Sequence, residues 1–164
     1  MFKKVAMSAP VLALAFVSSA ALAVPQTHNI QVVADIPSSD FYVQPVNHDT
    51  VAMPQQLLWN NTTSKLESIS RDFKVKSSVS ASAGPAIKAT LLDPAVMSSG
   101  ADDIQLNVRF NNVALTLGGE VEVVAADAAI AELITPMSIS PVEPSGGYKE
   151  GNYTGNVRVM FDAP

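Results

Sequence analysis

The sequence predicts an all-β sandwich of one domain, and the alternation of its residues and the absence of repeats and linkers support this expectation. Apolar and polar residues alternate with a period of two in several short segments, and turn residues separate these segments. The chain contains no cysteine, which excludes disulfides, thiol catalysis and cysteine-based metal sites. No repeat of fixed period and no long linker divides the chain, so we expect one sandwich domain.

The N-terminus has the pattern of a secretion signal. Lys3 and Lys4 precede an apolar stretch over residues 11–17, and Ala21-Leu22-Ala23 follows as a cleavage motif. We therefore expect residues 1–23 to be a signal peptide that is cleaved after Ala23. The apolar stretch is shorter than the roughly 20 residues of a spanning helix, so we expect an exported chain without membrane insertion.

The charge balance disfavours nucleic acid and anionic membranes as partners. Once Lys3 and Lys4 are removed, 8 basic and 15 acidic residues remain, a net charge of −7. Nucleic acids and anionic membranes both select for basic patches, which this composition does not favour.

The first strand expected after the signal is HNIQVVADI, residues 28–36. Ile30, Val32, Ala34 and Ile36 form its apolar face, and burial of that face contributes roughly 5–9 kcal/mol before ordering costs. A whole domain has a net stability of only about 5–15 kcal/mol. Because an exposed apolar edge invites aggregation, the strand must pair, either inside its own chain or with another molecule.

The later segments continue the same alternation: Phe73, Val75 and Val79 share one face of a strand, and Val113, Leu115 and Leu117 share the apolar face of another. Pro37 ends the opening strand, because proline has no N–H and biases the preceding residue toward extended geometry. Asn111-Asn112 predicts a tight hairpin turn, since asparagine tolerates positive φ. Residues 125–133 have a helix-forming composition and predict a short helical connection after a strand. Strands are expected within residues 41–50, 55–60, 66–83, 86–93, 103–110, 113–117, 120–124, 137–140 and 152–164.

Candidate catalytic or metal-binding residues are few and dispersed. His28 and His48 have no ligand partner at a suitable spacing, so we interpret both as loop residues and predict no metal and no cofactor. The nearest approaches to paired carboxylates, Asp102 with Asp103 and Glu120 with Glu122, are interpreted as solvated charge. We predict no catalytic residue. Trp59 is interpreted as an anchor of the core and not as a ligand contact.

Five segments in one order carry a family resemblance. They are HNIQVVADI, LLWNNTTSKLESISRDFKVKSSV, AIKATLLDPAVM, IQLNVRFNNVALT and GNYTGNVRVMFDA. With these segments the chain resembles the major pilins of the class 5 (α-fimbrial) chaperone–usher family, the colonization factor antigen and cable pilus type. The terminal Gly-Asn-Tyr-x-Gly-x-Val motif is the most specific of them.

The resemblance implies an incomplete immunoglobulin-like β-sandwich that a donor strand from the next subunit completes. Residues 24–37 would be the donor segment and residues 38–164 the pilin domain. The implied donor side chains are Ile30, Val32, Ala34 and Ile36, with Pro37 as the hinge. The implied acceptor-groove residues are Tyr153, Val157, Val159 and Phe161.

The resemblance also implies the function and the partners. The chain would be the major structural subunit of a surface fimbria, exported through the periplasm and supporting adhesion to host surfaces. Its partners would be identical subunits joined head to tail, a periplasmic chaperone, an outer-membrane usher and a tip adhesin subunit. The alternatives are a tip adhesin, a self-contained secreted binding protein, and a periplasmic enzyme on a sandwich scaffold.

Overall fold

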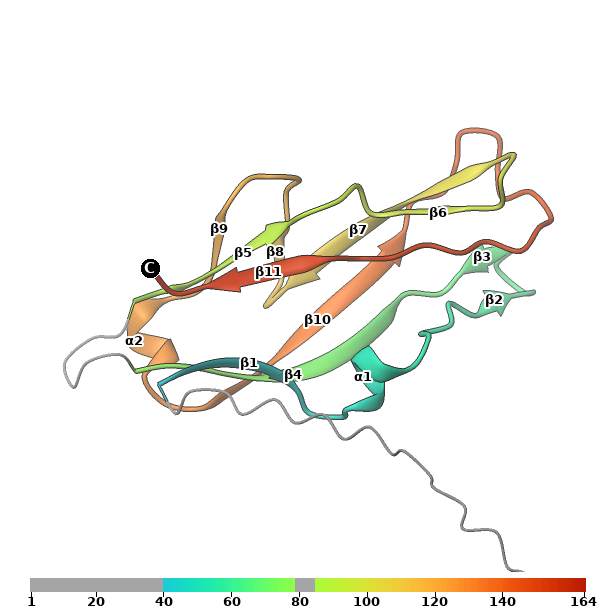
Figure 1. Ribbon diagram of the computed structural model, residues 1–164. Coiled ribbons are helices and arrows are strands. Elements are labelled where there is room, and N and C mark those ends of the chain that lie inside the picture. Colours follow the sequence, from blue (N-terminus) through green and yellow to red (C-terminus); the bar gives the residue numbers. More distant parts are fainter. Residues whose placement is uncertain (1–39, 79–84) are drawn as a thin grey trace, which may run out of the picture. The chain divides into compact units, whose positions relative to one another are not determined.

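The computed structural model describes residues 40–78 and 85–164. Figure 1 shows the strands and two short helices in this part of the chain. In chain order they are β1 (Phe41–Pro45), α1 (Asp49–Ala52), β2 (Trp59–Asn60), β3 (Lys65–Leu66), β4 (Ile69–Ser77), β5 (Ile87–Leu91), β6 (Val96–Ser98), β7 (Asp103–Phe110), β8 (Val113–Ala114), β9 (Val121–Val124), α2 (Ala126–Ala129), β10 (Leu133–Pro141) and β11 (Val159–Asp162).

Most strands belong to two antiparallel sheets. The larger sheet has the order β1-β4-β10-β7-β6, with β8 beside β7, and the smaller sheet has the order β11-β5-β9. Strands β2 and β3 form a separate hairpin. Buried residues of both sheets belong to one apolar cluster, so the sheets are the two layers of a sandwich. The predicted all-β class is confirmed.

Three aromatic rings connect the two layers through the core. Phe110 on β7 is fully buried and lies edge-on to Phe73 on β4, with 5.7 Å between ring centroids. Its other neighbour is Phe161 on β11, in the smaller sheet, at 4.7 Å. Phe73 also confirms the alternation predicted for β4, because Phe73 and Val75 are buried whereas Lys74 between them is half-exposed.

The predicted hairpin turn is present at Asn111 and Asn112. Their φ angles are 49° and 63°, the left-handed values that a two-residue turn between β7 and β8 requires. The predicted apolar face after the turn ends early: Leu115 is buried but Leu117 is 56% exposed. Strand β8 is only two residues long, so the period of two no longer fixes the side-chain direction at Leu117.

After β9, the predicted helical connection is confirmed, but the length predicted for the next strand is wrong. The predicted short helical connection is α2, a single turn. The strand expected at residues 137–140 is the nine-residue β10, which starts at Leu133 and lies between β4 and β7. Its local sequence contains Pro136, a poor strand former, so pairing with both neighbours determines its extent.

The opening strand, Pro37, His28 and Val79 lie outside the described residues. Among the residues that are described, no helix has the length and apolar character needed to cross a membrane.

Substitution at the hairpin turn tests the described geometry. We expect Asn112→Val to lower the free energy of unfolding by about 1–2 kcal/mol, because a β-branched residue is strained at positive φ. Asn112→Gly is the matched control and keeps the stability of the parent chain, since glycine adopts this φ freely. Urea denaturation measures both values, and equal losses for valine and glycine would contradict the turn.

Candidate functional site

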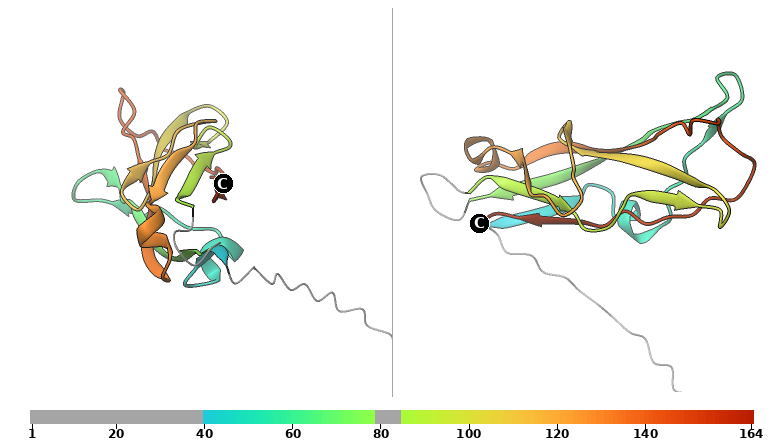
Figure 2. Two further views of the ribbon diagram at one scale, coloured as in Figure 1. Left: turned by 90° about the vertical axis from the view of Figure 1, so that its left-hand side faces the viewer. Right: turned by 90° about the horizontal axis from the view of Figure 1, so that it is seen from above.

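Each of the two sheets has an edge strand that pairs with a neighbouring strand on one side only. Strand β1 pairs with β4, and β11 pairs with β5; no other described strand pairs with either of them. Figures 1 and 2 place β1 and β11 on the same side of the sandwich. This side of the domain is therefore bordered by two strand edges with which no other described strand pairs.

A groove of about 730 Å³ opens along this side. Its floor is made of inward-facing apolar side chains from four strands of the larger sheet, Ile69, Phe73, Met97, Leu106, Met137 and Ile139. One wall consists of α1 and the segment after it, and the other consists of residues 153–157 before β11. The groove is thus an extended apolar channel with backbone along its sides.

Gly155 holds the second wall against β6. Thr154 and Ser98, next to this contact, exchange two backbone hydrogen bonds of 2.8 and 3.0 Å. A Cβ atom at Gly155 would lie 2.1 Å from the carbonyl oxygen of Val96, so any side chain would push the wall away. This close approach explains the second glycine of the terminal motif.

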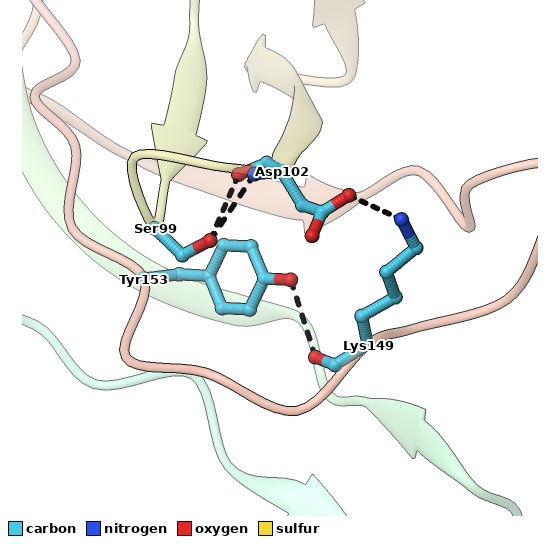
Figure 3. A network of polar contacts seen from close by, with 4 residues as sticks. All are labelled: Ser99, Asp102, Lys149 and Tyr153. Carbon is cyan, nitrogen blue, oxygen red and sulfur yellow. Dashed lines mark hydrogen bonds and ion pairs between the residues drawn. The ribbon is translucent and has the colours of Figure 1, made fainter.

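A polar network secures the start of the same wall (Figure 3). The Tyr153 hydroxyl donates to the backbone carbonyl of Lys149 at 3.2 Å, and the Lys149 ammonium contacts the Asp102 carboxylate at 2.5 Å. The Ser99 hydroxyl joins the network through the backbone of Asp102. Asp102 raises the pKa of Lys149 by its hydrogen bond and its charge. These contacts tie the loop before β11 to the β6–β7 turn.

The backbone of β11 presents hydrogen-bonding groups to the open side. The Leu92 N–H donates to the Arg158 carbonyl at 2.9 Å, so Arg158 faces β5. Because backbone direction alternates in an antiparallel pair, the N–H and C=O groups of Val159 and Phe161 face the opposite edge. An added strand would find these groups available, together with the apolar floor.

The residues expected from the sequence to form the groove lie along this wall and strand. Tyr153 and Val157 line the groove, whereas Val159 and Phe161 continue the line into β11 and pack against the core. The expected donor residues, Ile30, Val32, Ala34 and Ile36, and the expected hinge Pro37 lie outside the described part of the chain.

Sequence reasoning missed the opposite wall. Residues 41–50 were expected to contain a strand and a turn, but α1 follows β1 and its neighbour Met53 is 59% exposed. Val51 and Leu57 also line the groove from this side. The dispersed apolar residues between 51 and 58 are the only signal, because the segment has no regular period.

A hydrogen-bonded ion pair links β1 and β4 to the start of β10. The Tyr42 hydroxyl donates to Glu132 at 2.7 Å, and Lys74 lies 3.4 Å from the same carboxylate. The Tyr42 hydrogen bond, with a smaller contribution from the charge of Lys74, lowers the pKa of Glu132. A lowered carboxyl pKa favours the fold above the ordinary glutamate pKa, and this contribution is lost as the pH falls through the lowered value.

The charged residues of the described chain form no catalytic constellation. No group of three or more His, Cys, Asp or Glu residues in this part of the chain could hold a metal ion. His48 is exposed at the start of α1. Asp102 and Glu120, expected as solvated charge, form ion pairs with Lys149 and Lys88. The groove can bind an apolar extended segment, and its lining offers no reactive cluster.

The fold and its open groove define a β-sandwich of the pilin type. The chain belongs to the family of CS1 type fimbrial major subunits, whose model matches residues 26–162. Its fold is similar to that of the CooA pilin subunit from enterotoxigenic Escherichia coli, with a TM-score of 0.58 and 17% sequence identity. That match covers 73% of this chain and 86% of the other. No protein with a curated description matches the sequence significantly.

Family membership confirms the resemblance drawn from the sequence. The chain is a fimbrial major subunit, which is a structural component of a surface fimbria.

The role of Gly155 can be tested by adding a single methyl group. We expect Gly155→Ala to cost about 1–3 kcal/mol of stability, because the wall must move away from the Val96 carbonyl. Gly146→Ala is the matched control, since a Cβ there meets nothing within 4 Å. Urea denaturation compares the two variants. An unchanged midpoint for Gly155→Ala would contradict the close packing of the wall on β6.

Proposed function

We propose that the subunits of this fimbria join by donor-strand exchange, in which residues 28–36 of one subunit occupy the groove of the next. The observation that carries the proposal is the apolar groove whose wall, residues 153–157, leads directly into the open edge of β11. Such a groove offers a strand two forms of binding at once, backbone hydrogen bonds along the edge and pockets for alternate side chains.

The dimensions and chemistry of the opening strand fit this groove. Residues 30–36 span about 20 Å when extended, with the four apolar side chains on one face. The wall and strand from Tyr153 to Asp162 are long enough to run beside such a segment. Ile30, Val32, Ala34 and Ile36 would face the floor, which is itself lined by Ile, Leu, Met and Phe side chains.

The remaining parts of the chain take roles that follow from this exchange. Residues 1–23 would direct export, residues 24–37 would form the donor segment with Pro37 as its hinge, and residues 38–164 would form the body. Tyr153, Val157, Val159 and Phe161 would border the inserted strand. None of these steps needs a covalent reaction, so we assign no enzymatic activity.

Partners of the subunit before assembly follow from the exposed groove. An apolar groove of this size would promote aggregation, so a periplasmic chaperone would supply a temporary strand. An outer-membrane usher would then exchange that strand for the donor segment of the next subunit, and a tip adhesin subunit would end the fibre. The acidic composition of the chain gives no support to nucleic acid as a partner.

The donor face can be tested by charge substitution in the opening strand. We expect Ile30→Asp or Val32→Asp to abolish polymerisation, because a buried carboxylate without a partner is not tolerated in the groove. Both variants should still bind the chaperone, which uses the groove and not the donor strand. Gln31→Asp, on the opposite face, is the control that still polymerises.

The measurement is an unboiled denaturing gel of material sheared from cells that express the chain with its secretion partners. The parent chain and Gln31→Asp should give a ladder of multimers that collapses on boiling. A monomer band from the exported parent chain would mean that the strand completes its own sandwich. Loss of chaperone binding in Ile30→Asp would contradict the assignment of the donor face.

The acceptor wall can be tested in the same assay. We expect Val157→Asp to shorten or abolish the ladder, because residue 157 lines the groove. Met160→Asp is the matched control and leaves the ladder unchanged, because residue 160 is 45% exposed and does not line the groove. Chaperone binding should weaken in Val157→Asp as well, since chaperone and donor strand use one groove. A full ladder from Val157→Asp would exclude this wall as the border of the inserted strand.

A further inference from the structure

Trp59 and Tyr148 form an exposed aromatic corner at the end of the sandwich that lies opposite the C-terminus. The β2–β3 hairpin carries Trp59 to this end, and the loop between β10 and β11 also reaches it (Figures 1 and 2). The ring of Trp59 lies edge-to-face with Tyr148, at 5.6 Å between centroids and 83° between planes. Trp59 is 46% exposed, so its interpretation as a core anchor is wrong.

The corner borders a pocket of about 480 Å³, a volume within the range of small-molecule sites. Its lining includes the apolar residues Ile104 and Leu66 and the aromatic residues Trp59, Tyr148 and Tyr153. Two charged side chains also line it, Lys149 and Glu150. An exposed indole next to a pocket combines a flat apolar surface with polar groups at its rim.

The charged residues around the corner differ in whether they already have an ionic partner. Lys149 is held by Asp102 at 2.5 Å, as Figure 3 shows, and Lys65 beside Tyr148 is held by Glu143 at 2.8 Å. Glu150 makes no hydrogen bond or ion pair with another residue of the described chain. The corner therefore offers a free carboxylate acceptor, while both nearby lysines already have an anionic partner.

We propose that this corner binds the ring of a neutral hexopyranose. One face of a pyranose ring carries several C–H bonds, whose partial positive charge suits the electron-rich face of Trp59. Vicinal hydroxyls on the ring edge would donate hydrogen bonds to the Glu150 carboxylate, and charge-assisted bonds of this kind are strong. An anionic sugar fits poorly, because it would meet Glu150 without a free lysine to compensate. Tyr153 is the one residue that lines both this site and the groove, so the site would stay open beside an inserted strand and the fimbria would carry one copy in every subunit.

The single tryptophan of the chain makes the site directly observable. Purified fimbriae of the full chain are titrated with the methyl glycosides of galactose, glucose and mannose while tryptophan fluorescence is recorded. We expect a saturable change with at least one of the three, with a midpoint on the order of 1 mM, as suits contact with one ring. Saturation-transfer NMR of the same glycoside gives a second readout that does not depend on Trp59.

Four variants separate the site from a general effect on the fibre. Glu150→Gln should weaken binding at least fivefold and Tyr148→Ala should abolish it, whereas Glu122→Gln, an exposed carboxylate on β9, should leave it unchanged. Trp59→Ala should abolish the NMR signal while the fimbriae remain assembled.

Four results would overturn the proposal. One is the absence of a saturable response up to 100-fold above the expected midpoint in assembled fimbriae. Another is stronger binding of sialyllactose than of any neutral glycoside. A third is equal affinity in the parent chain and in Glu150→Gln. The last is a Trp59 fluorescence that acrylamide cannot quench in fimbriae, because the corner would then be covered by a second copy of the subunit.

Discussion

The open edge of β11 is the constraint on which the rest of the structure depends. Backbone N–H and C=O groups that leave water must be paired, and those of Val159 and Phe161 face an edge with which no described strand pairs. The apolar floor beneath that side also loses free energy while it faces water. One inserted strand satisfies both requirements together. Gly155 and the Tyr153 network fix the position of the wall against which such a strand would lie.

A groove that receives a strand from another copy has consequences for assembly. The proposed donor segment and the groove are different surfaces of one chain, so their contact would be heterologous and would extend into an open filament. Without cysteine, no disulfide can hold the subunits together. The strength of the fibre would come from the core that two neighbours share.

Local patterns predicted the fold class well and the groove poorly. The period of two placed Phe73 and Val75 in the core, and Asn111-Asn112 marked its turn, because each depends on neighbouring residues alone. The extent of β10 could not be predicted, since Pro136 opposes a strand locally and pairing with β4 and β7 overrides it. The groove depends on which edges the topology brings together, and Trp59 is exposed because its hairpin leaves both sheets. Only the terminal motif pointed to the wall that includes Tyr153 and Val157.

Disulfide trapping tests most directly whether the opening strand of one subunit lies in the groove of another. The chain has no cysteine of its own, so Val157→Cys can be combined in turn with Ile30→Cys, Val32→Cys, Ala34→Cys and Ile36→Cys without background. The account predicts that one pairing forms a disulfide between two different chains in sheared fimbriae, and that pairing gives the register. A disulfide within a single chain, found in exported monomer, would contradict it.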